Sequence, residues 1–271
     1  MILITGDTHG VHDYSKLSTW LDKHLHTIIS PETTEPVYVI IAGDFGFIWR
    51  NPEGKDAPKN AVHAKDLRTI DLAFTRAYPS VTFLWIDGNH ENFDVINSLP
   101  ITEMFGGRVN VITKNVIHLR RGEVYDLNGT KVLAMGGALS VDQMYRKEGV
   151  SWWPQEEISN AEVDNAIENL AKHDNTVDIV VSHTAPQPVV TELQAFLPAW
   201  SYRDWGMRRD DPSAAQLERL RKLITAKDWY FGHFHIDKRN LKIPESKIRF
   251  HALYDDIVSV HTDAKEENHG N

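Results

Sequence analysis

Five short polar strings in this sequence contain residues that bind metal ions, and each string follows an apolar run typical of a β-strand. In chain order they are Asp7-Thr8-His9, Gly43-Asp44, Gly88-Asn89-His90, Ser182-His183 and Gly232-His233-Phe234-His235. Together they supply two carboxylates, one amide carbonyl and several imidazoles, which suit divalent ions such as Mn, Fe, Co, Ni or Zn. Thiolate ligation is excluded because the chain has no cysteine.

The apolar runs predict the strands that position these strings. They are expected at Ile2 to Thr5, Val37 to Ala42, Val81 to Ile86, Val177 to Val181 and Trp229 to Phe231. Five segments could therefore deliver polar residues to one edge of a sheet, where loops carry sites. Alternate side chains of an extended segment share a face, so Asp7 and His9 are expected to point the same way, as are His233 and His235.

Helical patterns lie between the expected strands. Leu67, Ile70, Phe74 and Ala77 share a face at helical spacing, which favours a β-α-β unit. Capping boxes are expected to open two further helices, at Ser159 to Glu162 and at Ser213 to Gln216. Two stretches rich in short β-type runs predict a second sheet: Val109 to Met135, which contains the hairpin turn Asn128-Gly129, and Ile248 to His261.

The five strings, in this order, resemble the signature of the calcineurin-like metallophosphoesterase superfamily. The resemblance implies an α/β (α+β) fold of four layers, two packed mixed β-sheets flanked by helices. It also implies two divalent metal ions. By the resemblance, one ion is held by Asp7, His9, Asp44 and His235, and the other by Asp44, Asn89, His183 and His233, so that Asp44 bridges the two.

The implied reaction is hydrolysis of a phosphate ester by metal-bound hydroxide. Two cations about 3.5 to 4 Å apart clamp both sides of a phosphoryl displacement, and they lower the pKa of a bound water toward about 7. His90, next to Asn89, is the candidate that stabilises the transition state or protonates the leaving group, a role worth about 10² to 10⁴ in rate. Glu91 either orients His90 or is a solvated loop carboxylate.

Substrate contacts are expected from the segment Gly136 to Trp153, where Arg146 could bind phosphate and Tyr145 could stack on a base or sugar. Arg50 follows Asp44 closely and could also reach the site. A lid is expected from Phe196 to Trp205. Packing residues and solvated surface side chains explain the candidate substrate contacts as well, and core packing or an oligomer contact explains the segment Phe196 to Trp205 equally well.

The candidate metal residues are spread from position 7 to 235, which favours one catalytic domain, residues 1–262, followed by a polar tail, residues 263–271. The net charge of −9 argues against an extended grip on nucleic acid and favours a small phosphate-ester substrate. No secretory signal, apolar span of about 20 residues or disulfide framework is visible, so a cytoplasmic location and no membrane partner are expected. The oligomeric state is left open.

Two alternatives to a small-molecule phosphoesterase stay open. One is a nuclease-like phosphodiesterase acting on oligonucleotides, and the other is a non-catalytic protein-binding scaffold. Phosphoprotein phosphatase activity is not expected, because the second string continues Phe45-Gly46-Phe47 and lacks the Asp and Arg of that branch of the superfamily.

Overall fold

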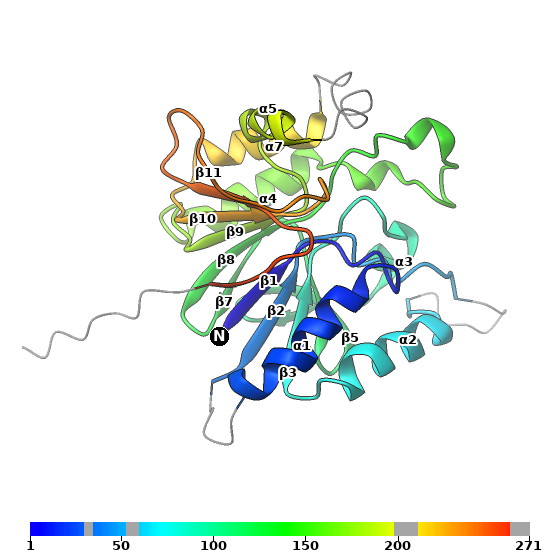
Figure 1. The fold of residues 1–271 in the computed structure, drawn as a ribbon. Coiled ribbons are helices and arrows are strands. Elements are labelled where there is room, and N and C mark those ends of the chain that lie inside the picture. The colour runs from blue at the N-terminus through cyan, green and yellow to red at the C-terminus, as the bar shows by residue number, and fades with distance from the viewer. Residues whose placement is uncertain (30–34, 53–59, 198–210, 261–271) are drawn as a thin grey trace, which may run out of the picture.

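The computed structural model describes residues 1–29, 35–52, 60–197 and 211–260. The predicted tail and residues 198–205 of the predicted lid lie outside these ranges. Two mixed β-sheets pack face to face, with helices on both outer faces (Figure 1). The predicted architecture of four layers is confirmed.

The first sheet has seven strands, in the order β13-β1-β2-β3-β6-β5-β4. The strands β1, β2, β3 and β6 are parallel to one another, and the remaining strands pair antiparallel with their neighbours. Their bounds are β1 Ile2–Thr5, β2 Val37–Ile41, β3 Val81–Trp85, β4 Thr102–Met104, β5 Gly107–Thr113, β6 Val116–Leu119 and β13 Ile257–Val260.

The second sheet has six strands, in the order β11-β12-β10-β9-β8-β7. Parallel pairing joins the four inner strands β8 to β9, β9 to β10 and β10 to β12, while both edge strands are antiparallel. Their bounds are β7 Glu123–Leu127, β8 Thr130–Met135, β9 Ile179–Ser182, β10 Asp228–Phe231, β11 Lys238–Leu241 and β12 Arg249–Ala252.

Helices cover the outer faces because the inner strands are apolar on both sides. In β2, Ile40 packs between the two sheets, whereas Val39 and Ile41 pack against the outer helices. The first sheet is covered by α1 Tyr14–Ile28, α2 Ala64–Ile70, the π-helical turn η1 Asp71–Arg76 and α3 Phe93–Ser98. The second is covered by α4 Asn160–Ala171, α5 Gln187–Leu193 and α7 Pro212–Arg221.

Three short 3₁₀ helices complete the described elements: η2 Gln143–Tyr145, η3 Pro154–Glu156 and η4 Gln194–Phe196. Within the described ranges, none of the helices combines the length and hydropathy that a transmembrane span requires.

Two local predictions are confirmed. Ser159 caps α4, and its hydroxyl accepts from the Glu162 N–H while the Glu162 carboxylate accepts from the Ser159 N–H. Asn128 and Gly129, with φ of 56° and 85°, form the hairpin turn between β7 and β8. Both signals are local, so they do not depend on the rest of the fold.

The predicted second capping box is wrong by two residues. Helix α7 begins at Pro212, and the Asp211 carboxylate accepts from the N–H groups of Ser213 and Ala214. The Ser213 hydroxyl instead accepts from the Ile158 N–H, so tertiary packing has taken this side chain. Proline is favoured in the first helical position because its missing N–H would be unpaired there.

The predicted face of the helix before Pro79 is only partly correct. Ile70 and Phe74 are buried, but Leu67 is 37% exposed and Ala77 is exposed beyond the last helical residue. The chain turns from α-helical to π-helical at Asp71, and the wider turn changes which residues share a face.

The β-type runs predicted to form a second sheet are divided between both sheets. The strands β5, β6 and β13 join the first sheet, whereas β7, β8 and β12 join the second. The chain crosses from one sheet to the other between Leu119 and Glu123. An alternating pattern predicts a strand and its buried face but not its neighbours.

Candidate metal centre

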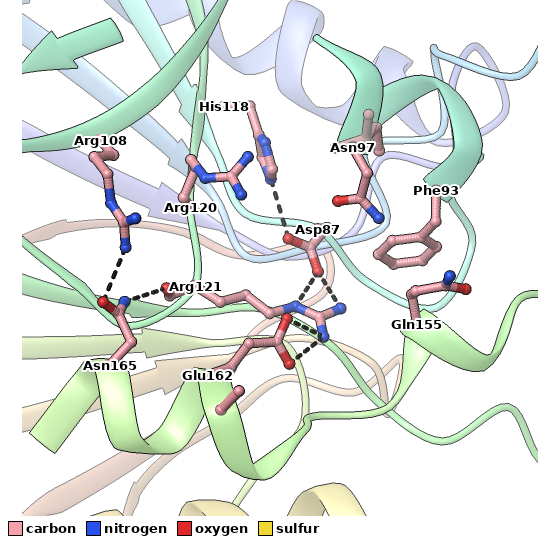
Figure 2. Close-up of a pocket in the computed structure, with 12 residues that line it drawn as sticks. Asp87, Phe93, Asn97, Arg108, His118, Arg120, Arg121, Gln155, Glu162 and Asn165 are labelled. Atoms are coloured by element: carbon pink, nitrogen blue, oxygen red, sulfur yellow. Dashed lines mark hydrogen bonds and ion pairs between the residues drawn. The ribbon is translucent and has the colours of Figure 1, made fainter. Parts of the chain in front are cut away.

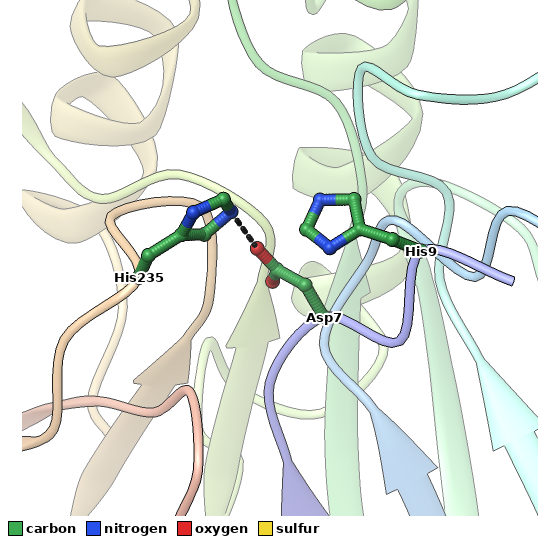
Figure 3. Close-up of side chains that lie close together, drawn as sticks. All are labelled: Asp7, His9 and His235. Carbon is green, nitrogen blue, oxygen red and sulfur yellow. Dashed lines mark ion pairs between the residues drawn. The ribbon is translucent and has the colours of Figure 1, made fainter. Parts of the chain in front are cut away.

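All five polar strings lie at the carboxyl ends of parallel strands. The strings that contain Asp7, Asp44 and Asn89 follow β1, β2 and β3, and those that contain His183 and His233 follow β9 and β10. Both sheets therefore contribute to one cluster. Figure 3 shows part of this cluster, with the Asp7 carboxylate between the rings of His9 and His235.

The strings contain residues whose backbone is not extended. Alternation along an extended segment is therefore not the reason why Asp7 and His9 lie together, and that part of the prediction is wrong. His9, Asp44, His233 and His235 have φ of 44°, 45°, 69° and 51°. Non-glycine residues adopt such values rarely, and they concentrate at functional sites where the surrounding structure enforces them. Left-handed turns, rather than strand alternation, bring these side chains together.

Glycines in the strings allow the candidate ligand side chains to approach one another. A Cβ atom at Gly88 would overlap the Asp44 carboxylate, and one at Gly232 would overlap that of Asp7. Any larger residue would push these carboxylates out of the cluster. The glycines are therefore needed for close packing of the donors.

Asp44 lies at the centre of the cluster and is 1% exposed. Its Oδ2 atom is 3.2 Å from His9 Nε2, and its Oδ1 atom is 3.2 Å from His183 Nε2. The Asn89 carbonyl oxygen also lies 3.2 Å from His183 Nε2. The two carboxylate oxygens thus face imidazoles that come from different sheets.

Asp7 forms the second anionic point of the cluster and is fully buried. Its Oδ2 atom is 3.2 Å from His235 Nε2, and its Oδ1 atom accepts from the His233 N–H at 3.0 Å. The His233 ring packs beside that of His183, with their centroids 4.9 Å apart.

The donor set fits divalent cations. Potential ligand atoms of Asp7, His9 and His235 lie within 4.8 Å of one another, and so do those of Asp7, Asp44 and His183. Carboxylate and imidazole ligands suit borderline divalent ions. Two buried carboxylates at one point also favour the presence of a compensating cation.

Hydrogen bonds fix the orientation of two imidazoles. The Nδ1 atom of His9 lies 2.6 Å from Asp13 Oδ2, and that of His183 lies 2.8 Å from the Ala42 carbonyl oxygen. When Nδ1 donates to these oxygens, Nε2 presents its lone pair to the centre, as in many metal sites. Asp13 was not singled out from the sequence, although its distance of four residues from His9 could have indicated it.

Electrostatics at the centre favour positive charge. Burial opposes protonation of both His9 and His183, but the charge and hydrogen bonds of Asp44 outweigh it and raise the pKa of each to about 9. The same negative field that holds these protons would hold a cation, and the protons would leave as it binds.

A sequence model described as calcineurin-like phosphoesterase matches residues 1–237 of this chain. The chain belongs to the calcineurin-like phosphoesterase family. It is thus a metal-dependent phosphoesterase, and the predicted resemblance is confirmed. No curated protein matches the chain by sequence.

Solved structures of low sequence identity align with most of this chain. Phosphopantetheinyl hydrolase from Mycobacterium tuberculosis aligns with a TM-score of 0.52 and 13% identity, over 93% of this chain and 89% of the other. The protein TT1561 of Thermus thermophilus aligns with a TM-score of 0.47 and 12% identity, over 93% of this chain and 87% of the other. The likeness to the hydrolase concerns the fold alone at such an identity.

His90 lies at the rim of the phosphoesterase centre. Its backbone N–H donates to Asp44 Oδ1 at 2.8 Å, and its ring Nε2 is 4.0 Å from Asp44 Oδ2. The Arg146 Nη2 atom lies 3.0 Å from Nε2 and 3.1 Å from Nδ1 of the same ring. Burial lowers the pKa of His90, and the Arg146 charge adds to this effect while Asp44 opposes it.

The three predicted substrate contacts have different surroundings. Arg146 is anchored by Asp142, whose Oδ2 accepts from its Nε at 2.8 Å, and it reaches the rim of the centre beside His90. Tyr145 is 86% exposed on the same segment. The Arg50 guanidinium forms an ion pair with Asp66 of α2, which belongs to none of the five strings.

Glu91 is fully buried, so its interpretation as a solvated loop carboxylate is wrong. Its Oε1 atom accepts from the Phe45 N–H at 2.7 Å, and its Oε2 atom is 3.3 Å from the Gly46 nitrogen. Glu91 therefore holds the turn that follows Asp44. These hydrogen bonds go to that backbone rather than to His90.

The loop that contains Asn89 is anchored by residues that sequence reasoning missed. Asp87 is buried, accepts from Arg121 Nε at 2.6 Å and lies 3.0 Å from His118 Nε2. Arg121 also donates to Glu162 at 3.1 Å, and these side chains line a cavity of about 370 Å³ (Figure 2). An aspartate two residues after the end of β3 was the available signal, but its partner Arg121 is distant in sequence.

Proposed function

We propose that this phosphoesterase hydrolyses small phosphate esters with two divalent metal ions. Asp7, His9, Asp44 and His235 would hold one ion, and Asp44, Asn89, His183 and His233 would hold the other. The observation that carries this proposal is the placement of Asp44, whose two oxygens each lie 3.2 Å from an imidazole of a different set. This arrangement suits a carboxylate that bridges two ions.

When bound, the two ions would polarise the phosphoryl oxygens and activate a water molecule near neutral pH. The chain's own residues supply the rest. The buried carboxylates of Asp7 and Asp44 would offset part of the positive charge of the cations, and the hydrogen bonds to Asp13 and Ala42 keep His9 and His183 oriented. Preorganised groups of this kind need no rearrangement during the reaction.

His90 and Arg146 would act on the phosphate ester itself. Arg146 offers N–H donors and a fixed positive charge to a phosphoryl oxygen at the rim of the centre. Its charge also helps to keep the His90 ring neutral, and a neutral ring still has one N–H that can hydrogen-bond the departing oxygen. We assign to His90 the assistance of the leaving group.

A compact, partly apolar ester group suits the segment beside the centre. Met144 and Tyr145 are 71% and 86% exposed, and both lie within two residues of Arg146 in the chain. A ring on the substrate, such as that of a nucleoside, could pack on Tyr145 while its phosphate contacts Arg146. The net charge of −9 disfavours long polyanions.

The test compares wild type with His90→Ala on paired chromogenic phosphate monoesters and diesters. Mn²⁺ and Ni²⁺ are supplied separately, and bound metal is measured on both proteins. We expect wild type to bind two ions and turn over one ester class, and His90→Ala to lose about 10² to 10⁴ in kcat with its metal retained. A single bound ion, or an unchanged kcat in the variant, would refute the proposal.

A further inference from the structure

A buried chain of hydrogen bonds leads away from Asn89 to a carboxylate that the proposed reaction does not use. The Asn89 Nδ2 atom donates to the Ser140 hydroxyl oxygen at 3.1 Å, and the Ser140 hydroxyl donates to Glu156 Oε2. Asn89, Ser140 and Glu156 are 4%, 1% and 0% exposed. Water therefore does not replace these contacts easily.

The position of Glu156 is itself fixed from two sides. Its Oε1 atom accepts from the Trp153 N–H at 3.1 Å, and its backbone carbonyl accepts from the Ala138 N–H at 2.9 Å. Both carboxylate oxygens of Glu156 thus face donors. The carboxylate can serve only as an acceptor in this arrangement.

This polarity determines which way the Asn89 amide faces. The single hydroxyl proton of Ser140 goes to Glu156, so the Ser140 oxygen can only accept from Asn89. The NH₂ group of Asn89 must then point to Ser140, and its carbonyl oxygen must point to the metal centre, where it lies 3.2 Å from His183 Nε2. The opposite orientation would present N–H donors to a cation.

We propose that Ser140 and Glu156 are positioning residues that hold the Asn89 carbonyl oxygen toward the metal centre. The inference rests on the proposed role of Asn89 as a metal ligand. Partners that orient a ligand typically change metal affinity or activity by about 10- to 100-fold when they are removed. Neither residue lies in the five strings, since Ser140 follows β8 and Glu156 ends η3.

The decisive substitution is Glu156→Gln, which keeps the shape but leaves one acceptor oxygen. If that oxygen stays with the Trp153 N–H, the new NH₂ group donates to Ser140. The Ser140 proton then turns to Asn89, whose amide must rotate to accept it. The rotation would place the NH₂ group of Asn89 against the ion.

The experiment titrates Mn²⁺ into metal-stripped protein at pH 8 and follows the free ion by electron paramagnetic resonance. Burial raises the pKa of Glu156 to about 7, so the carboxylate predominates at this pH. The variants are Glu156→Gln, Ser140→Ala, their double mutant and Asn89→Ala. The matched control is Glu157→Gln, the same change one residue along, where the backbone carbonyl accepts from Arg121 Nη1 at 3.1 Å.

We expect Glu156→Gln and Ser140→Ala each to lower the affinity for one of the two Mn²⁺ ions by about 10- to 100-fold. Glu157→Gln should leave the affinity for both ions unchanged. Because both residues act through one amide, the double mutant should bind Mn²⁺ as Ser140→Ala does, within about twofold. Thermal unfolding of each metal-stripped variant is measured in parallel, since a structural role alone would lower the melting temperature without changing Mn²⁺ affinity.

The outcomes separate this inference from the proposed function. If Asn89→Ala leaves Mn²⁺ binding unchanged, the proposed ligand set is wrong. If Asn89→Ala lowers the affinity for one Mn²⁺ ion while Glu156→Gln and Ser140→Ala do not, the positioning role is overturned and the ligand set stands. A loss of Mn²⁺ affinity in Glu157→Gln equal to that in Glu156→Gln would also overturn the positioning role.

Discussion

Removal of the Arg121 guanidinium is expected to destabilise the protein strongly. Arg121 and Asp87 are 5% and 3% exposed in their side chains, and Arg121 donates to Asp87 at 2.6 Å and to Glu162 at 3.1 Å (Figure 2). Burial opposes ionisation of Asp87, yet Arg121 and His118 hold its pKa well below the usual range. Without Arg121, the Asp87 carboxylate remains buried and charged, and His118 is its nearest partner.

The magnitude follows from this uncompensated charge. Breaking a buried ion pair by removing one partner costs about 3 to 5 kcal/mol. A cost of about 4 kcal/mol corresponds to a fall in melting temperature of roughly 8 to 16 °C for a chain of this size. That is a large part of the roughly 5 to 15 kcal/mol by which domains are stable.

Urea unfolding of the metal-stripped protein measures this cost in Arg121→Met. The double mutant Asp87→Asn with Arg121→Met should recover at least half of the loss, because neither buried charge remains. The control is Arg219→Met on α7, where the side chain is 48% exposed and lies 3.8 Å from Asp164, so we expect under about 1 kcal/mol. The reasoning is refuted if Arg121→Met costs no more than this control, or if Asp87→Asn gives no recovery.

Three further outcomes are expected. Arg146→Met should lower kcat/KM by about 10- to 100-fold, since a hydrogen bond to a charged group is worth about 1.5 to 3 kcal/mol; unchanged steady-state kinetics would contradict the contact with phosphate. Asp228→Asn should reduce the fall in the free energy of unfolding as pH is lowered into the acid range. Burial opposes ionisation of Asp228, but hydrogen bonds from His251 and Arg249 lower its pKa, so its contribution is present above about pH 4, the unfolded value, and is lost as pH falls through the lower folded value. If the free energy of unfolding changes with pH in the same way for wild type and Asp228→Asn from about pH 2.5 to 7, this linkage is excluded. Chelation should lower the melting temperature because Asp44 is then buried without its cation. Mn²⁺ at 100 times its Kd should restore about 2.7 kcal/mol of stability, or roughly 5 to 11 °C. A melting temperature that does not change with chelator or Mn²⁺ would count against a metal at Asp44.

The sequence by itself determined the order of the site and most of its strands. Each polar string directly follows an apolar run, and β1 spans Ile2–Thr5 as expected. The strings are informative because chain connectivity places them at strand ends, where parallel neighbours bring their loops to one edge. The same local character explains why the Ser159 cap and the Asn128 turn were predictable.

Only the tertiary structure decided which groups meet. Alternation along a strand predicts which face is buried, so it could not assign β6 to one sheet and β7 to the other. The left-handed backbone at Asp44, the burial of Glu91 and the bond from Ser140 to Glu156 likewise depend on segments distant in the chain. A periodic pattern encodes the type and orientation of an element, whereas contacts between elements are fixed by packing of the whole core.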